Sequence, residues 1–129
     1  MVYSILVVDD ERDSRQSLSE LLSSRGYAVT TALDGHQALT AVEESETDLV
    51  ILDLNMPDMT GLSVLREVQR RKPDLPVITM SAYASKEKKL ELLQEGARYF
   101  LPKPIDVDVL LEEISRILDR ENKEERGTS

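Results

Sequence analysis

Short aliphatic runs alternate with amphipathic helical patterns along most of this 129-residue chain. The runs are too short for helices and rich in β-branched residues, so they predict buried strands. Each helical pattern carries its apolar residues three or four positions apart, which places them on one face. Strict alternation of this kind predicts βαβ units and a parallel sheet. Five strands are expected, at residues 5–8, 27–32, 49–52, 77–80 and 99–101.

Five helices are expected between and after these strands. Asp34 is a candidate N-cap, and Gly26 and Gly96 are expected to end the helices that precede them. The clearest apolar stripe runs from Val107 to Leu118, in the last helix. We therefore expect one domain over residues 1–119, followed by a hydrophilic tail, linker or frayed helix end at 120–129. The first, fourth and fifth helices are expected at residues 11–25, 85–94 and 107–118. The second is expected after Asp34 and carries Ala38, Leu39 and Val42, and the third is expected between Gly61 and Pro73 and carries Leu62, Leu65 and Val68.

The composition of each strand predicts its place in the sheet. Strands buried on both faces are continuous aliphatic runs, as the first and third runs are and as the fourth is apart from Thr79. The second run is interrupted by Thr30 and Thr31 and the fifth is very short, so both are expected at the edges. With right-handed crossovers, these placements favour a doubly wound α/β sheet of order 2-1-3-4-5. A ligand is then expected outside the carboxyl ends of the first and third strands.

The overall composition excludes several classes of function. The chain has 16 basic and 25 acidic residues, for a net charge of −9, which disfavours binding to nucleic acid or to an anionic membrane. It has no cysteine, so disulfides, thiolate metal sites and cysteine nucleophiles are excluded. No run reaches the roughly 18 apolar residues of a membrane span, and the N-terminus lacks the basic region of a signal peptide. We expect a soluble, cytoplasmic protein.

Acidic, hydroxyl and amino side chains follow the strands at the predicted binding edge. Asp9 and Asp10 end the first strand, Asp53 ends the third, Ser81 ends the fourth, and Lys103 follows the fifth. Converging carboxylates raise one another's pKa unless a cation or an ammonium compensates them. Oxygen ligands without His or Cys select a hard cation, and a small carboxylate set with open positions suits Mg²⁺.

These groups together predict phosphoryl chemistry. A carboxylate can attack phosphorus when its own charge and that of the phosphoryl group are neutralised. Asp53 is the best nucleophile candidate because its strand is central. Asp9 and Asp10 would hold the metal, Lys103 would supply a second positive charge, and Ser81 would donate a hydrogen bond to a phosphoryl oxygen. Taken singly, each residue has an ordinary structural explanation, such as a helix cap or a solvated side chain; their shared edge favours the functional one.

Widely spaced motifs carry a resemblance to a known family. They are Asp9-Asp10-Glu11, the segment from Asp53 to Gly61, Ser81-Ala82, Gly96-Ala97, and the segment from Phe100 to Pro104. With this ordered set, residues 3 to about 119 resemble the receiver domain of two-component response regulators. The resemblance implies the flavodoxin-like form of the doubly wound fold.

The resemblance also implies a role for each matching residue. Asp53 would accept a phosphoryl group from a phosphohistidine on a sensor histidine kinase or a phosphotransfer protein. Asp10 and Asp53 would bind Mg²⁺ directly, Asp9 largely through water, and Asn55 through its backbone carbonyl. Lys103 would contact the phosphoryl oxygens, and its peptide bond to the following proline would be cis.

The same resemblance implies a conformational switch. Phosphorylation would draw Ser81 toward Asp53 and leave a space into which Phe100 rotates. The face expected to change is made of the fourth helix, the fifth strand and the fifth helix, and it would control a partner or an output domain. We expect the phosphorylated form to dimerise through this face.

Several positions depart from the commonest pattern of the family. Tyr99 stands where an acidic residue is common, so a charge pairing across the dimer face is expected to be missing. Pro102 stands where a small aliphatic residue is usual and removes a backbone donor. Asn55 and Tyr83 flank the phosphorylation pocket, and we expect them to set the lifetime of the phosphoryl group by gating water.

Two other functions use related chemistry or topology. A Mg²⁺-dependent phosphatase of the haloacid-dehalogenase type also forms an aspartyl-phosphate, but it needs a second aspartate where Asn55 stands, and it needs a cap domain. A flavodoxin-like FMN binder would need a phosphate-binding loop after the first strand, where Asp9, Asp10 and Glu11 would repel phosphate. We therefore expect a phosphoacceptor switch rather than an enzyme, with slow loss of its own phosphoryl group as its only turnover.

Overall fold

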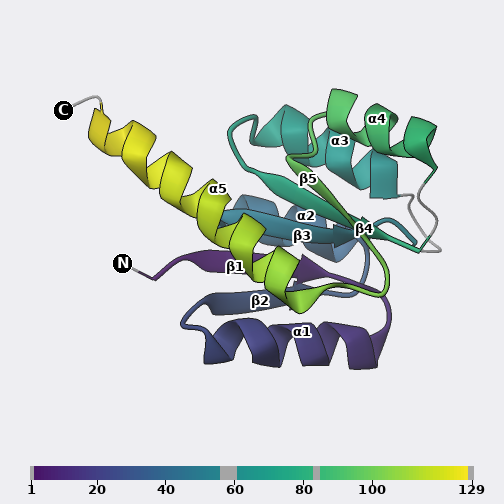
Figure 1. Ribbon diagram of the computed structural model, residues 1–129, viewed down its shortest axis with the longest axis horizontal. Coiled ribbons are helices and arrows are strands. Elements are labelled where there is room, and N and C mark those ends of the chain that lie inside the picture. Colours follow the sequence, from purple (N-terminus) through teal and green to yellow (C-terminus); the bar gives the residue numbers. More distant parts are fainter. Residues whose placement is uncertain (1, 56–60, 83–84, 128–129) are drawn as a thin grey trace.

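A single five-stranded parallel sheet forms the centre of the protein (Figure 1). The computed structural model describes residues 2–55, 61–82 and 85–127, with side chains described as far as Asp119. Its strand order is β2-β1-β3-β4-β5, and each neighbouring pair is parallel, which confirms the predicted order and the predicted edge strands. The strands are β1 (Ser4–Val8), β2 (Ala28–Ala32), β3 (Leu49–Asp53), β4 (Val77–Ser81) and β5 (Tyr99–Pro102).

Helices cover both faces of this sheet (Figure 1). α1 and α5 pack on one face, and α2, α3 and α4 pack on the other. Each face therefore has its own hydrophobic core, as a doubly wound sheet requires. The helices are α1 (Arg12–Ser24), α2 (Gly35–Glu44), α3 (Gly61–Arg71), α4 (Lys86–Gln94) and α5 (Val107–Gly127).

Alternate residues of the inner strands supply the two cores. In β1, Ile5 and Val7 pack with α1 and α5, whereas Leu6 and Val8 pack on the opposite face. Successive side chains of a strand point to opposite faces, so a strand covered on both sides needs apolar residues at every position. This requirement explains the aliphatic runs of β1 and β3, and that of β4 apart from Thr79, whose hydroxyl donates to the carbonyl of Tyr99 at 3.2 Å; the burial of all three strands confirms the prediction.

Several helix ends lie where the sequence predicts them. Gly26 has a φ of +92° and its N–H donates to the carbonyl of Ser23, so it ends α1 in the left-handed conformation that glycine adopts without strain. The Asp34 carboxylate accepts the N–H of Gln37 at 2.8 Å and caps α2. These two signals are local, which is why they can be read from sequence alone.

The last helix is longer than its apolar stripe indicates, and of the alternatives left open for residues 120–129 the structure has helix as far as Gly127. α5 continues to Gly127, beyond the apolar stripe that ends at Leu118. Residues 120–126 are mostly Arg, Glu and Lys, which have good helix propensity, so the helix continues where there is nothing left to bury. Among the described residues, no helix combines the length and apolarity that a bilayer crossing requires.

The strand ends differ slightly from prediction in a way that matters for the site. β3, β4 and β5 each extend by one residue, to Asp53, Ser81 and Pro102. The two site residues Asp53 and Ser81 therefore belong to hydrogen-bonded strands and not to the loops that follow. The Lys103–Pro104 peptide bond after β5 is cis, as the resemblance implies.

Gly61 brings the start of α3 against the residue that follows Asp53. A methyl group at Gly61 would overlap the Cα and the side chain of Leu54. We expect Gly61→Ala to lower the free energy of unfolding by about 1–3 kcal/mol, because backbone must move to admit the methyl group. Urea denaturation measures the change. Thr40→Ala, at an exposed position in α2, is the control and is expected to leave stability within about 0.5 kcal/mol of the parent; equal values for the two variants would contradict the contact.

Candidate functional site

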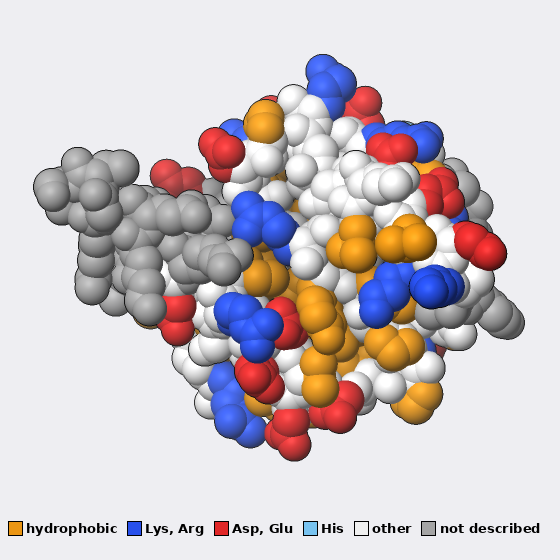
Figure 2. Space-filling model, turned by 45° about the horizontal axis from the view of Figure 1, so that its top comes forward, with side chains coloured by type: hydrophobic (Ala, Val, Ile, Leu, Met, Phe, Trp, Pro, Cys, Tyr) orange, Lys and Arg blue, Asp and Glu red, His pale blue; other side chains and the backbone are white. Residues whose placement is uncertain are grey.

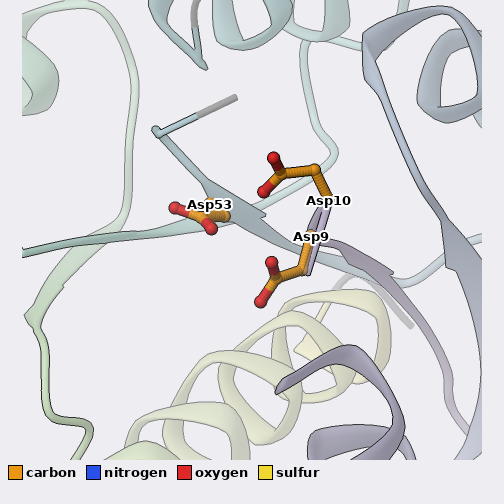
Figure 3. A group of neighbouring side chains, drawn as sticks. All are labelled: Asp9, Asp10 and Asp53. Atoms are coloured by element: carbon orange, nitrogen blue, oxygen red, sulfur yellow. The ribbon is translucent and has the colours of Figure 1, made fainter. Parts of the chain in front are cut away.

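The carboxyl ends of β1 and β3 bring three aspartates together. Asp9 and Asp10 directly follow β1, and Asp53 is the last residue of β3. Each carboxylate has an oxygen within 4.8 Å of an oxygen of the others. Figure 3 shows the three side chains grouped at the ends of the two strands. β1 and β3 are neighbours although β2 lies between them in sequence, so this cluster sits at the switch point of the sheet.

Lys103 reaches the same cluster from the end of β5. Its Nζ lies 2.9 Å from Oδ2 of Asp53, whose side chain is 3% exposed. The other oxygen of Asp53, Oδ1, accepts the backbone N–H of Asn55 at 3.0 Å. The backbone N–H of Lys103 donates to the carbonyl of Ser81 at 2.9 Å. Lys103 is therefore attached both to the end of β4 and to the carboxylate at the end of β3.

Ser81 and Phe100 lie on the same face of the sheet. Ser81 is buried at the end of β4, one residue beyond Met80, which is in register with Asp53. Phe100 is opposite Thr79 in β5, and Thr79 and Ser81 share a face because they are two residues apart. Phe100 is buried in the core beneath α3 and α4. Phe100 thus shares a core with Leu92 of α4 and lies on the same face of the sheet as Ser81.

The pKa of Asp9 is shifted by its surroundings in the cluster. Its side chain is almost fully buried, and its pKa is raised from 3.8 to about 6, mainly because of this burial. The negative charge of Asp53 contributes to the increase, whereas the N–H of Glu11, which donates to Oδ1 of Asp9 at 2.9 Å, and the charge of Lys103 oppose it. One ammonium is therefore too little to compensate three carboxylates. A hard divalent cation fits a site with this donor set and this uncompensated charge.

A hollow of about 470 Å³ adjoins the acidic cluster. Asp9 and Lys103 form its polar wall, and the rest is mostly apolar and comes from α1, β4, the segment after β5 and the start of α5. A larger hollow of about 640 Å³ lies at the amino ends of β3 and β4, and none of the predicted site residues lines it. The residues that line the smaller hollow besides these two are Ser14, Ser17, Leu18, Leu21, Met80, Pro104, Ile105, Val107 and Leu110.

Arg15 also reaches the site, although the sequence interpretation did not single it out. Its Nη1 donates a hydrogen bond of 2.9 Å to the backbone carbonyl of Asp9. A hydrogen bond from a side chain to a backbone carbonyl does not restrict the type of the accepting residue, so the sequence gives little sign of it. The one available signal is an arginine near the start of α1, where the helix dipole disfavours a positive charge.

Two sequence predictions concern residues outside the described ranges. The loop motif at 56–60 and the water-gating role expected of Tyr83 both fall there. Asn55, the last described residue before the first gap, contacts Asp53 through its backbone N–H.

The molecule is thus a doubly wound α/β domain with an acidic site at its switch point, and comparison with known proteins identifies its family. Residues 5–115 match the family described as response regulator receiver domain. The chain belongs to this family, as the sequence motifs predict.

Relatives of known name agree with this assignment. The chain is 38% identical over 125 residues to "Response regulator MprA" of Mycobacterium sp. (strain KMS), a match that covers 97% of this chain and 54% of the relative. It is 40% identical over 114 residues to "Transcriptional regulatory protein ZraR" of Salmonella typhimurium, covering 88% of this chain and 26% of the relative. The chain therefore spans about half or less of the length of these two proteins.

Solved structures confirm the flavodoxin-like fold. The CheY-like response regulator receiver domain protein from Methanospirillum hungatei JF-1 superposes with a TM-score of 0.91 at 31% identity, covering 96% of this chain and 99% of that one. Chemotaxis protein CheY4 of Vibrio cholerae superposes with a TM-score of 0.86 at 35% identity, covering 92% of this chain and 100% of that one.

The raised pKa of Asp9 predicts a pH-dependent stability difference. We expect Asp9→Asn to raise the free energy of unfolding of the metal-free domain at pH 7 by about 1–2 kcal/mol, because a buried charge is removed. In the parent, Asp9 ionises at about 3.8 in the unfolded chain but at about 6 in the folded one. The advantage of the variant is therefore small near pH 4 and grows until the pH passes about 6.

Chemical denaturation in the presence of a chelator, repeated across this pH range, measures the difference. Asp74→Asn changes the net charge equally at an exposed turn and serves as the control. A stability gain that is the same at every pH, or that the control variant shares, would contradict the burial of a charged Asp9.

Proposed function

We propose that this domain is a phosphoacceptor switch that receives a phosphoryl group on Asp53 from a phosphohistidine of a sensor histidine kinase or a phosphotransfer protein. One observation carries the proposal: a buried carboxylate at the switch point is paired with Lys103 at 2.9 Å and lies next to two further carboxylates. A structural ion pair would need only one of those acids. The excess negative charge supports a site that binds a cation.

The acidic cluster would hold Mg²⁺. The ligands would be the carboxylates of Asp10 and Asp53, the backbone carbonyl of Asn55, and Asp9 largely through water. Bound there, the ion supplies charge neutralisation for the attacking carboxylate and for the phosphoryl oxygens. The raised pKa of Asp9 supports this assignment: burial is its main cause, the negative charge of Asp53 adds to it, and a nearby cation would favour the ionised form.

The contacts of Asp53 suit a nucleophile. In the transfer, a carboxylate oxygen of Asp53 forms a bond to phosphorus as the P–N bond of phosphohistidine breaks, and the electron pair of that bond returns to the imidazole nitrogen. The backbone N–H of Asn55 orients one oxygen of Asp53. The Lys103 ammonium, bound to the other oxygen, would contact the phosphoryl oxygens and compensate the charge that they bring.

The hollow beside Asp9 and Lys103 supports docking of a protein donor. Its polar wall lies next to the reacting carboxylate, and the remaining wall is largely apolar and formed by α1 and the start of α5. A phosphohistidine is part of a folded protein, so its transfer needs such a contact surface next to the acceptor.

The output would be a shift between two packings of the β4–α4 region. The Ser81 hydroxyl would bind the phosphoryl group, and Phe100 would move into the space that it leaves. Phe100 packs in the same core as Leu92 of α4, so its movement would change the packing of α4 against the sheet. The surface that responds would be formed by α4, β5 and α5, and it would control a partner or an output domain.

Acetyl phosphate with Mg²⁺ should add one phosphoryl group to the chain, detected by intact mass spectrometry. Asp53→Ala is expected to abolish the addition, because the nucleophile is lost, and a chelator is expected to suppress it in the parent. Asp74→Ala, an acid remote from the site, is the control and should be modified like the parent. Modification that persists in Asp53→Ala, or sustained turnover of small phosphate esters, would contradict the proposed switch.

The α4–β5–α5 surface exposes apolar side chains that suit a second copy of the domain. Leu90 is 52% exposed and Leu93 is 40% exposed on α4, and Val107 at the start of α5 is 41% exposed. Figure 2 shows hydrophobic side chains in the middle of one side of the molecule, next to lysines and arginines. We expect the beryllofluoride-bound domain to dimerise through this surface.

Sedimentation velocity with and without beryllofluoride tests the dimer. Leu90→Gln should weaken association by about tenfold, the loss expected when one apolar anchor of an interface is removed. Leu33, 44% exposed before α2, provides the matched control, and Leu33→Gln should dimerise like the parent. An unchanged mass at high concentration with the phosphoryl analogue bound would exclude the dimer.

A further inference from the structure

Arg15 joins the acidic site from a helix position that does not favour a positive charge. It is the fourth residue of α1, near the amino end, where the helix dipole favours acidic side chains and disfavours cations. Its side chain is nevertheless half-buried and directed back along the chain, where Nη1 donates a 2.9 Å hydrogen bond to the backbone carbonyl of Asp9. The hydrogen bond to Asp9 compensates for the unfavourable interaction between the Arg15 charge and the helix dipole.

This hydrogen bond holds the peptide unit between Asp9 and Asp10. A peptide unit is planar, so fixing the carbonyl oxygen of Asp9 also fixes where the N–H and Cα of Asp10 lie. The rest of Asp9 is held as well: its N–H donates to the carbonyl of Ala32 at 3.1 Å, and its carboxylate accepts the N–H of Glu11 at 2.9 Å. Arg15 thus adds the contact that determines the direction in which the chain continues to Asp10.

Asp10 needs such support more than its two neighbours do. Asp9 and Asp53 are buried, whereas Asp10 is exposed. Packing holds a buried carboxylate in place, but an exposed one depends on its backbone for its direction. The guanidinium contact therefore acts on the carboxylate of the cluster that packing holds least.

We propose that Arg15 is a positioning residue, which orients the Asp10 carboxylate toward the cation through the Asp9–Asp10 peptide. The inference rests on the magnesium site of the proposed function. It goes beyond that site because it assigns a role to a residue that touches neither the cation nor the phosphoryl group.

The charge of Arg15 and its hydrogen bond have opposite effects on cation binding. The guanidinium repels a divalent cation, so if charge were its only effect, neutralising it would tighten Mg²⁺ binding. If the hydrogen bond orients Asp10, neutralising Arg15 would weaken Mg²⁺ binding despite the lost repulsion. The sign of the change separates the two explanations.

Calorimetric titration of the unphosphorylated chain with Mg²⁺ gives this sign directly. We expect Arg15→Gln to weaken Mg²⁺ binding by about tenfold, the usual loss when a partner that orients a metal ligand is removed. Arg15→Lys should recover part of the affinity, since a lysine can donate to the same carbonyl. Arg12→Gln removes the same charge from an exposed position in the same helix and should bind Mg²⁺ as tightly as the parent or slightly more tightly.

A second measurement uses no cation. Hydrogen exchange of the Asp10 amide, followed by NMR in a chelator, should be faster in Arg15→Gln than in the parent or in Arg12→Gln. The amide of Ile51 in the central strand should exchange equally in all three proteins. Thermal unfolding by circular dichroism establishes that each variant is folded at the temperature of the titration.

The outcomes distinguish this inference from the proposed function. If the parent binds Mg²⁺ and Arg15→Gln binds it equally or more tightly, the positioning role is wrong and the magnesium site stands. If the parent binds no Mg²⁺, the magnesium site is wrong and the role of Arg15 is wrong with it. Weaker binding in Arg15→Gln together with parent-like binding in Arg12→Gln supports the proposal.

Discussion

Repulsion among three carboxylates at one end of the sheet is the constraint on which the rest of the site depends. Asp9, Asp10 and Asp53 lie within 4.8 Å of one another, and Lys103 supplies one compensating charge. The folded chain therefore has an unfavourable electrostatic energy that any bound cation lowers. A site of this kind is destabilising by itself, and the aliphatic cores on both faces of the sheet stabilise the fold around it.

The order of the strands makes this concentration of charge possible. Parallel strands direct all their carboxyl ends to one edge, and the reversal of order at β1 leaves room there for a ligand. Asp53 and Ser81 end neighbouring strands, and the N–H of Lys103 donates to the carbonyl of Ser81. Backbone hydrogen bonds alone thus join the ends of β3 and β4 and the segment that follows β5, which are distant in sequence.

How much of this can be predicted from sequence depends on the range of each interaction. The strand order follows from which runs are mostly aliphatic, and the ends of α1 and α2 follow from Gly26 and Asp34, because burial and capping depend on the type of the residue itself. The length of α5 does not follow, since its last residues are helical by propensity without an apolar stripe. The contact of Arg15 with the Asp9 carbonyl does not follow either, because one partner is a backbone atom, which every residue has.

The backbone contacts of the site also limit how the switch can work. The Ser81 carbonyl accepts the N–H of Lys103, and the Met80 carbonyl accepts the N–H of Leu54. These hydrogen bonds tie the end of β4 to both neighbouring segments, so the end of the sheet cannot shift without breaking them. A phosphoryl group on Asp53 would therefore act through rotation of the Ser81 side chain and through the chain that follows it. In the proposed switch, Phe100, buried on the same face as Ser81, would be the side chain through which the change passes to α4.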